Sequence, residues 1–374
     1  MAKPFAYRRR IMEGDAIFDV GIIGYGASAK IFHIPFIAVT PQLRLGAIVQ
    51  RAPSEDNSAP RDHPNVRHYN RVDELLADAD IDLVIVTTPP DSHFALTKAA
   101  LEAGKHVLTE KPFVPTAAEA DQLATLARDK KRLLCVYQNR RWDADFLTVR
   151  HLVANQTLGR IVDFDSHFDR YRPVVPPNWK GELELTSGGG AVFELGSHLV
   201  DQVYVLFGMP RSVHGRLLSQ RRGGVDVVAP DSMTAELTYP NGMLAHIRTS
   251  VLSVETSQQR FWIRGERGSF HKLDLDPQED QLKAGLGPTD SDYGPQDVDK
   301  MRLILVNGDG IPAEVKVPVV EAETYSGFYA ALARALQSGR EDQLPVQVQE
   351  VRDVLRILEA IVESAKSGRD VVFG

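Results

Sequence analysis

The chain has 374 residues and only one cysteine, Cys135. A single cysteine excludes an internal disulfide framework and a metal site built from cysteines. It lies in the apolar run from Leu133 to Tyr137, so we expect a buried and inert thiol. The scarcity of cysteine is typical of a reducing compartment, and we expect the protein to be cytoplasmic.

The chain also lacks long hydrophobic runs and an excess of basic residues. No segment approaches the length of about 20 apolar residues that a membrane span requires. The net charge of −7 argues against a general nucleic-acid binder, which usually presents a basic face. Residues 1–15 are basic at Arg8-Arg9-Arg10 but have no apolar core, and Glu13 and Asp15 also disfavour a mitochondrial presequence. We expect a flexible tail there, and neither a membrane nor a nucleic acid as a partner.

Apolar strands alternate with amphipathic helices in residues 16–138. Such alternation implies parallel strands joined by right-handed crossovers, so we predict a doubly wound Rossmann sheet that binds NAD(P). The expected strands are 18–23, 43–49, 66–69, 83–87, 106–109 and 133–137. The expected helices are 72–79, 93–103 and 117–129. Residues 51–64 are rich in Pro, Ser, Asn and Asp and are predicted to form a surface loop.

The pattern changes in residues 139–374. After a helix at 143–154, strands of period two are expected at 160–168, 212–219, 234–239, 243–251, 261–264 and 268–273. Pro240-Asn241-Gly242 is typical of a hairpin turn, and successive hairpins give antiparallel pairing. Helices at 325–337 and 349–367 are expected to cover this sheet. The predicted fold class is therefore α/β, with a Rossmann sheet followed by an α+β domain containing a large, mainly antiparallel sheet.

A sheet covered by helices on one face is expected to leave an apolar face exposed on the other. Pairing of two such faces would remove that surface from water. We therefore predict that residues 139–374 serve for substrate binding and for oligomerisation, giving a homodimer or homotetramer through the C-terminal sheet.

The segment Gly24-Tyr25-Gly26-Ala27-Ser28-Ala29 follows the first strand and has the G-x-G-x-x-A form of the dinucleotide fingerprint. The first glycine permits the tight turn, the second lets the backbone approach a pyrophosphate, and the small third residue allows close helix–strand packing. The helix that follows presents free N–H groups and a positive dipole end to phosphates. These six residues are predicted to bind a nucleotide cofactor.

The second strand ends in Gln50-Arg51, where an NAD-binding protein usually has an acidic residue that accepts the ribose hydroxyls. An arginine in that place can pair with a 2′-phosphate, so NADP is favoured over NAD. The alternative interpretation of Arg51 is a solvated loop residue.

The fourth strand closes in Thr87-Thr88-Pro89-Pro90, at the edge of the sheet where ligands of doubly wound folds bind. Thr87, Thr88 and Pro89 are therefore candidates for cofactor contact. His93 follows in the first turn of the next helix, where it either contacts the cofactor or stabilises this turn.

Glu110 and Lys111 follow the fifth strand and are expected at the same edge, which makes both candidates for cofactor contact. A lysine at a strand end is ordinarily solvated. Held beside a cofactor, however, Lys111 could donate to a substrate oxygen, with a pKa lowered by partial burial.

Glu194 and His198 follow the glycine run 188–190 and, four apart on a helix, share a face. Asp201 lies three residues further on. A core helix with a polar side is one interpretation, and metal binding is disfavoured because two ligands lack a nearby third. A neutral imidazole facing a nicotinamide is the better chemical use, because it can accept the proton when an alcohol is oxidised.

With these motifs in place, the chain resembles the Gfo/Idh/MocA oxidoreductase family over nearly its full length. In that family a cofactor fingerprint, a strand-end E-K-P and a D-x-x-x-H helix after a glycine run occur in this order. They correspond here to residues 24–29, Glu110-Lys111-Pro112, and Glu194 with His198. Segments 139–143, 167–173 and 276–282 resemble most closely the branch of NADP-dependent scyllo-inositol dehydrogenases.

The resemblance implies that Lys111 and His198 flank the reacting C–OH group, and that Glu194 contacts a sugar-like substrate. Glu194 stands where the family usually has aspartate, which moves the charge outward by one methylene. We expect a small-molecule polyol, sugar or related cyclic substrate, with Arg170, Tyr171 and Trp179 at the mouth of its site; packing on the sheet surface is their alternative role. Reduction of a specialised-metabolite ketone or imine, and non-catalytic regulation by a bound NADP, remain alternatives.

Overall fold

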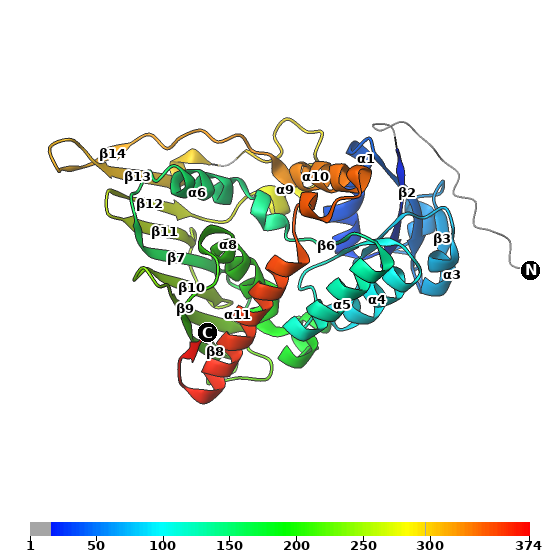
Figure 1. The fold of residues 1–374 in the computed structure, drawn as a ribbon, viewed down its shortest axis with the longest axis horizontal. Coiled ribbons are helices and arrows are strands. Elements are labelled where there is room, and N and C mark those ends of the chain that lie inside the picture. The colour runs from blue at the N-terminus through cyan, green and yellow to red at the C-terminus, as the bar shows by residue number, and fades with distance from the viewer. Residues whose placement is uncertain (1–15, 296) are drawn as a thin grey trace, which may run out of the picture.

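Two β-sheets organise the protein, as the computed structural model in Figure 1 shows. The structure describes residues 16–295 and 297–374, so the tail expected at 1–15 lies outside the described residues. The first sheet has six parallel strands in the order β3-β2-β1-β4-β5-β6, which is the predicted doubly wound topology. Its strands are β1 (Phe18–Ile23), β2 (Leu43–Val49), β3 (Arg67–Tyr69), β4 (Leu83–Val86), β5 (His106–Thr109) and β6 (Leu134–Val136).

Helices cover both faces of this sheet. They are α1 (Ile34–Val39), α2 (Ala59–Asp62), α3 (Val72–Ala77), α4 (His93–Glu102) and α5 (Ala117–Lys130). The strands between them are continuously apolar because both faces are buried; all four residues of β4 are buried, for example. Thr116 and Glu119 form a capping box that begins α5. Cys135 is fully buried on β6, as predicted, and burial raises the pKa of its thiol to about 12.

The second sheet has nine strands in the order β14-β13-β12-β11-β7-β10-β9-β8-β15. All neighbours pair antiparallel except β7 and β10, which are parallel. The strands are β7 (Ile161–Asp169), β8 (Ser212–Leu218), β9 (Ser232–Thr238), β10 (Leu244–Ser250), β11 (Gln259–Gly265), β12 (Gly268–Leu273), β13 (Met301–Val306), β14 (Pro312–Val315) and β15 (Val371–Val372). Sequence patterning did not predict the last three, which are edge or near-edge strands and are short or largely exposed.

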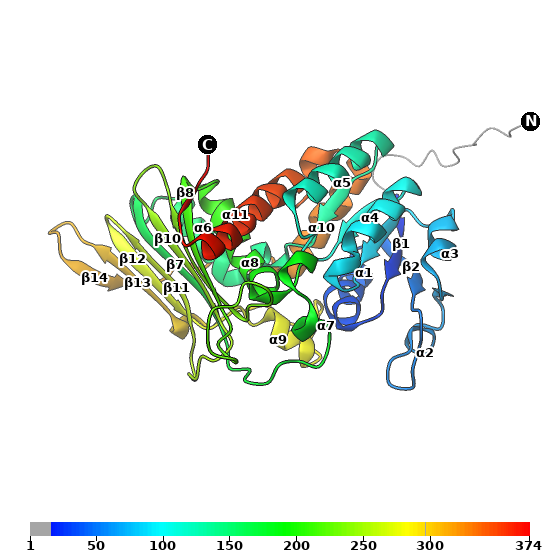
Figure 2. The same ribbon diagram turned by 90° about the horizontal axis from the view of Figure 1, so that it is seen from below.

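The helices of the second half lie between the two sheets, on one side of the large sheet (Figure 2). They are α6 (Ala144–Ala154), α7 (Trp179–Glu182), α8 (Ser197–Phe207), α9 (Gln278–Lys283), α10 (Thr324–Ser338) and α11 (Val348–Ser367). The long helix α11 packs against β8, α8 and α5, and its buried stripe includes Val351, Val354, Leu358 and Ile361. One amphipathic helix thus joins the two halves. No described helix is long and apolar enough to span a membrane.

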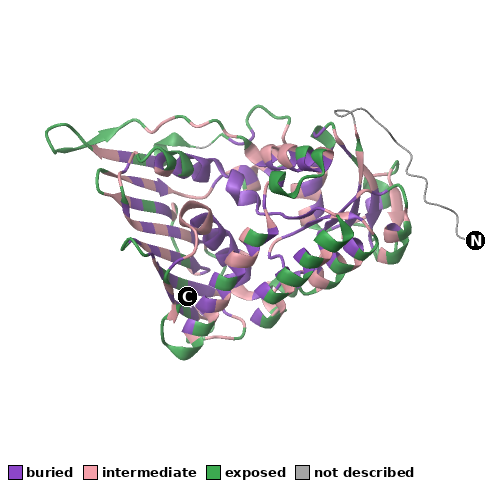
Figure 3. Ribbon diagram, in the orientation of Figure 1, coloured by how far each residue is buried: buried purple, intermediate pink, exposed green. Residues whose placement is uncertain are grey.

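The open face of the large sheet is charged, and the prediction of an apolar face was wrong. Along β7 the buried Phe164 alternates with the accessible Asp163 and Asp165, and Figure 3 shows this alternation along the strands. Arg264 of β11 lies 3.3 Å from Asp163 and 3.4 Å from Asp165. The accessible side chains of β7 and β9 are mainly polar, so water solvates them. Assembly through the sheet stays a prediction, and it would bury ion pairs together with the exposed Trp262.

Candidate active site

A cleft of about 1340 Å³ lies between the two halves of the chain and brings most of the predicted site residues together. The predicted residues that line it are Gly24, Tyr25, Gly26, Ala27, Ser28, Arg51, Thr87, Thr88, Pro89, Glu110, Lys111, Arg170, Trp179, Glu194 and His198. Ala29, His93 and Tyr171 are not among the lining residues. The fingerprint, the strand-end lysine and the Glu194–His198 segment therefore face one space, although they are far apart in sequence.

The glycine turn after β1 has the geometry that a dinucleotide requires. Gly24 has φ = 101°, a backbone conformation that other residues rarely adopt, and a Cβ there would lie 3.0 Å from Thr87 Oγ1. Both the backbone conformation and the lack of space therefore disfavour a larger residue. A Cβ on Gly26 would meet nothing within 4 Å, because that position faces the open cleft. The chain thus provides room at the place where a pyrophosphate would approach the backbone.

The helix after the fingerprint contains a π-helical segment, η1 (Ala29–His33), before α1 begins. A π-turn is common at functional sites, and here it places His33 in the interior. His33 Nε2 lies 3.1 Å from Glu110 Oε1, and its Nδ1 lies 2.6 Å from the Tyr329 hydroxyl. Sequence reasoning missed His33, because its partners are distant in the sequence.

Glu110 ties the fingerprint to the catalytic edge of the sheet. Its carboxylate accepts hydrogen bonds from the Ser28 hydroxyl and, at 2.9 Å, from the Lys111 backbone N–H. Burial would raise the pKa of Glu110, but His33, Ser28 and Lys111 outweigh this effect and hold it below its ordinary value. An ionised Glu110 thus connects the Ser28 side chain to the backbone after β5, and it is itself one of the residues that line the cleft.

The loop after β2 folds back against the fingerprint. The buried Gln50 side chain donates to Asn57 O at 2.8 Å and accepts from Ala59 N at 2.7 Å, while Asn57 donates to Tyr25 O at 2.9 Å. Gln50 therefore shapes the loop, and the adjacent Arg51 is left exposed at the rim of the cleft.

His93 lies behind the wall of the cleft. It is fully buried, with Nδ1 at 2.8 Å from Pro112 O and Nε2 at 2.8 Å from Thr88 O. The ring joins the loop after β4 to the loop after β5, which supports the alternative role of stabilising this turn.

The Lys111 side chain crosses from the first half of the chain to the second. Its Nζ donates to the backbone oxygen of Glu194 at 2.9 Å. Burial lowers the pKa of Lys111 to about 8, and the neighbouring Lys180 and Arg140 cations add to the effect, against the carboxylates of Glu110 and Glu194. The lysine is poised near neutral pH, with an ammonium that can donate to a substrate oxygen.

His198 lies on α8 and is only 5% exposed. Its ring packs against Phe168, with centroids 6.5 Å apart, and its buried Nδ1 has no hydrogen-bond partner among the described residues. Burial lowers the pKa of His198 well below its ordinary value, helped by the cations of Lys111, Arg140 and Arg260. The imidazole is therefore neutral at pH 7, as a proton acceptor must be.

Glu194 forms no hydrogen bond with His198 in the described part of the chain, although their spacing predicts a shared helix face. Its carboxylate accepts from Arg170 Nη2 at 3.1 Å and lies 3.7 Å from Lys180 Nζ. The reason is local geometry: Glu194 lies in a π-helical segment, η5 (Val192–Gly196), which precedes α8, so the ordinary i, i+4 relation to His198 does not hold. Burial would raise the pKa of Glu194, but Arg170, Lys180 and Lys111 keep it lowered.

The other predicted residues of this region, Trp179, Tyr171 and Asp201, do not all line the cleft. Trp179 lines the cleft at the start of α7, whereas Tyr171 is 57% exposed and pairs with Leu252 as an isolated bridge. Asp201 forms a buried ion pair with Arg141, at 2.7 and 2.9 Å, and so has a structural role. Within residues 16–295 and 297–374, no group of three or more His, Cys, Asp or Glu side chains could hold a metal ion.

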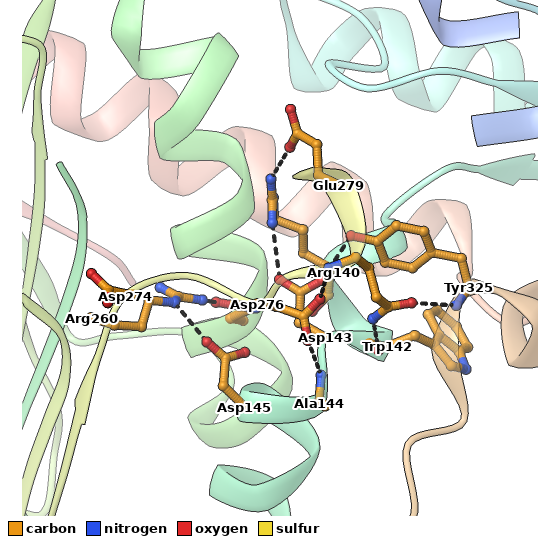
Figure 4. A network of polar contacts seen from close by, with 12 residues as sticks. Arg140, Trp142, Asp143, Ala144, Asp145, Arg260, Asp274, Asp276, Glu279 and Tyr325 are labelled. Carbon is orange, nitrogen blue, oxygen red and sulfur yellow. Dashed lines mark hydrogen bonds and ion pairs between the residues drawn. The ribbon is translucent and has the colours of Figure 1, made fainter. Parts of the chain in front are cut away.

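A buried polar network holds Arg140 in the cleft wall (Figure 4). Arg140 forms ion pairs with Asp143, at 3.1 Å, and with Glu279, and the Tyr325 hydroxyl donates to Asp143 at 3.0 Å. The Phe168 ring, which also packs against His198, lies 4.9 Å from the Arg140 guanidinium carbon. Arg140, Phe168 and Glu279 lie in the segments 139–143, 167–173 and 276–282 that carry the family resemblance, but nothing in the local spacing indicates that these segments and Tyr325 meet.

Both halves of the chain are similar to known oxidoreductases. A family model for the oxidoreductase family with an NAD-binding Rossmann fold matches residues 18–138, and one for the GFO/IDH/MocA C-terminal domain matches residues 146–271. The uncharacterized oxidoreductase C115.03 of Schizosaccharomyces pombe is 38% identical, over 94% of this chain and 98% of its own length. The scyllo-inositol 2-dehydrogenase (NADP(+)) IolW of Bacillus subtilis is 37% identical, over 94% of this chain and 95% of its own.

A solved structure of an oxidoreductase from Bacillus cereus has a TM-score of 0.82 and 30% identity, covering 96% of this chain and 99% of that one. Both halves of the chain thus match one family, in the order in which the two sheets occur. The chain belongs to the Gfo/Idh/MocA family of oxidoreductases.

Proposed function

We propose that this oxidoreductase is NADP-dependent and transfers hydride between the nicotinamide and a C–OH or C=O carbon of a polyol, sugar or related cyclic compound. One observation carries the proposal: a single cleft is lined by the dinucleotide turn and by both Lys111 and His198. The relative named as an NADP-dependent scyllo-inositol dehydrogenase supports the same class of reaction.

The fingerprint residues 24–29 would hold the pyrophosphate, and Arg51 would face the adenosine 2′-phosphate. Thr87, Thr88, Pro89 and Glu110 would border or fix the nicotinamide half of the site. When bound, NADP supplies the hydride acceptor, and the protein supplies position and charge.

His198 and Lys111 act on one substrate oxygen. In the oxidation direction the neutral His198 accepts the hydroxyl proton, and the Lys111 ammonium donates a hydrogen bond to the same oxygen as negative charge develops on it. In reduction the imidazolium returns that proton. Glu194, held by Arg170, accepts from a neighbouring substrate hydroxyl, and Trp179 encloses the substrate at the mouth of the cleft.

The cofactor preference is tested at Arg51. We expect the wild-type protein to bind NADPH more tightly than NADH, and Arg51→Asp to reduce or reverse this preference, because a carboxylate repels the 2′-phosphate and accepts from ribose hydroxyls instead. Titration of both dinucleotides into both proteins measures the four affinities. Arg44→Asp, on the accessible side of β2, is the control and should leave the ratio unchanged. Equal wild-type affinities for NADPH and NADH would contradict the preference.

The reaction itself is tested with a panel of inositols, aldoses and cyclic ketones, by following NADPH absorbance. We expect substrate-dependent oxidation or reduction with at least one class of compound. Tight NADPH binding without turnover of any compound would instead support the non-catalytic alternative.

A further inference from the structure

A second, small cavity adjoins the substrate end of the cleft. The two spaces share Arg170, Arg172, Lys180 and Glu194 in their walls. Glu194 separates this cavity from the reacting groups, since its backbone oxygen binds Lys111 and its carboxylate binds Arg170. A group bound in the small cavity would therefore be separated only by Glu194 from Lys111, the proposed donor to the reacting oxygen.

Basic side chains dominate the walls of this cavity. Five line it, against two carboxylates; the basic residues are Arg170, Arg172, Lys180, Arg221 and Arg222, and the acidic ones are Glu194 and Asp231. The Arg221 side chain is only 11% exposed and its Nε donates to Arg172 O at 2.8 Å. Burial lowers the pKa of Arg221, and the Arg170 and Arg172 cations add to this effect against Asp231 and Glu194.

The carboxylates around the cavity offset these cations only in part. Asp226, which is not a lining residue, lies 3.8 Å from Arg222. The Asp231 carboxylate accepts hydrogen bonds from two backbone groups, Gln220 N at 2.6 Å and Arg221 N at 3.3 Å. It also lies 3.6 Å from the Arg221 guanidinium. Glu194 is shared between Arg170 and Lys180.

Two guanidinium groups retain free donors. The Arg170 Nε is buried and has no hydrogen-bond partner within the described chain. Arg172 is exposed at the rim of the cavity, and its guanidinium forms no ion pair with any residue in 16–295 or 297–374. A buried N–H donor without an acceptor is costly, and an arginine fork matches the oxygens of a carboxylate or phosphate.

The small cavity is distinct from the fingerprint turn. None of the fingerprint residues 24–29 lines it, whereas the large cleft is lined by residues 24–28 and also by Arg170, Arg172 and Lys180. The basic residues of the small cavity follow β7 directly or lie in the segments 172–180 and 219–231.

We propose that the small cavity binds an oxyanion group of the substrate, so that the substrate is a polyol or sugar bearing a carboxylate or a phosphate ester. This inference rests on the proposed function and narrows its substrate class. Arg170, Arg172 and Arg221 contact the anion, while the hydroxyl-bearing carbon faces Lys111 and His198. A neutral ring such as scyllo-inositol leaves the cavity filled only by water.

The test compares compounds that share one ring: D-glucose, D-glucuronate and D-glucose 6-phosphate, with scyllo-inositol as a second neutral compound. We expect one anionic compound to have a kcat/KM with NADP about tenfold or more above that of D-glucose. Comparing D-glucuronate with D-glucose 6-phosphate shows whether the cavity prefers a carboxylate or a phosphate ester. Arg172→Gln should lower the anionic-to-neutral ratio of kcat/KM about tenfold, whereas Arg216→Gln, an exposed arginine on β8, should not change it.

A binding measurement separates this inference from the proposed function. With saturating NADPH occupying the cofactor site, inorganic phosphate or sulfate should change the tryptophan fluorescence of the protein, because Trp179 lines the adjoining cleft. The change should occur at lower concentrations in the wild type than in Arg172→Gln. Such binding without turnover of any compound would support the oxyanion site while overturning the proposed reaction. Equal kcat/KM for neutral and anionic compounds, or no anion binding sensitive to Arg172→Gln when turnover is absent, would overturn the oxyanion site.

Discussion

His198→Ala should lower kcat by roughly 10²–10⁴-fold, because it removes the group that exchanges the hydroxyl proton. NADPH affinity should change little, since His198 is proposed to face the substrate and is not one of the fingerprint residues 24–29. Steady-state rates and NADPH titration on the same preparation measure the two effects separately.

The control for this variant is His214→Ala, which removes a partly exposed imidazole paired with Asp370 on the edge of the large sheet. It should keep wild-type kcat. A near-wild-type rate in His198→Ala would refute the assignment of the proton acceptor, and loss of NADPH binding would show that the variant has lost more than that group.

Lys111→Ala should be similarly damaging, roughly 10²–10³-fold in kcat, because one donor to a developing oxyanion is lost. The double variant Lys111→Ala/His198→Ala should lose less than the product of the two single losses, since both groups act on one oxygen. Lys98→Ala, which removes an exposed lysine of α4 paired with Glu102, is the matched control. Independent, multiplicative losses would contradict a shared oxygen.

The sequence predicted most of the architecture because the signals were local. Apolar runs gave the six parallel strands nearly to the residue, and the G-x-G-x-x-A segment indicated the turn that Gly24 makes at positive φ. Sequence patterning did not predict β14, because every residue of this strand is exposed and it has no alternation of buried apolar residues.

The candidate site was predicted only in part, for a physical reason. Lys111 and His198 lie next to recognisable motifs, and the structure places both in one cleft. The contacts that influence their protonation could not be predicted from local spacing. Arg140, for example, is held by Asp143, Glu279 and the network of Figure 4, which only the folded chain brings together.

Glu194 shows a second limit of pattern reasoning. Spacing assumes 3.6 residues per turn, and the π-helical segment η5 breaks that assumption, so the carboxylate pairs with Arg170 rather than with the imidazole. The same ion pair marks one wall of the small basic cavity, a feature that no local motif indicates.

The pH dependence of kcat/KM for alcohol oxidation tests the central claim most directly, because it distinguishes which residue accepts the proton. Burial lowers the pKa of Lys111 to about 8, so its ammonium is present below this value and is lost above it. The pKa of His198 is lowered well below its ordinary value, so the imidazole stays neutral through the range near pH 6.5. The account predicts a flat profile through neutral pH and a fall above about pH 8, absent in Lys111→Ala; a rate that rises through pH 8 would mean that the neutral lysine is the base, and would contradict it.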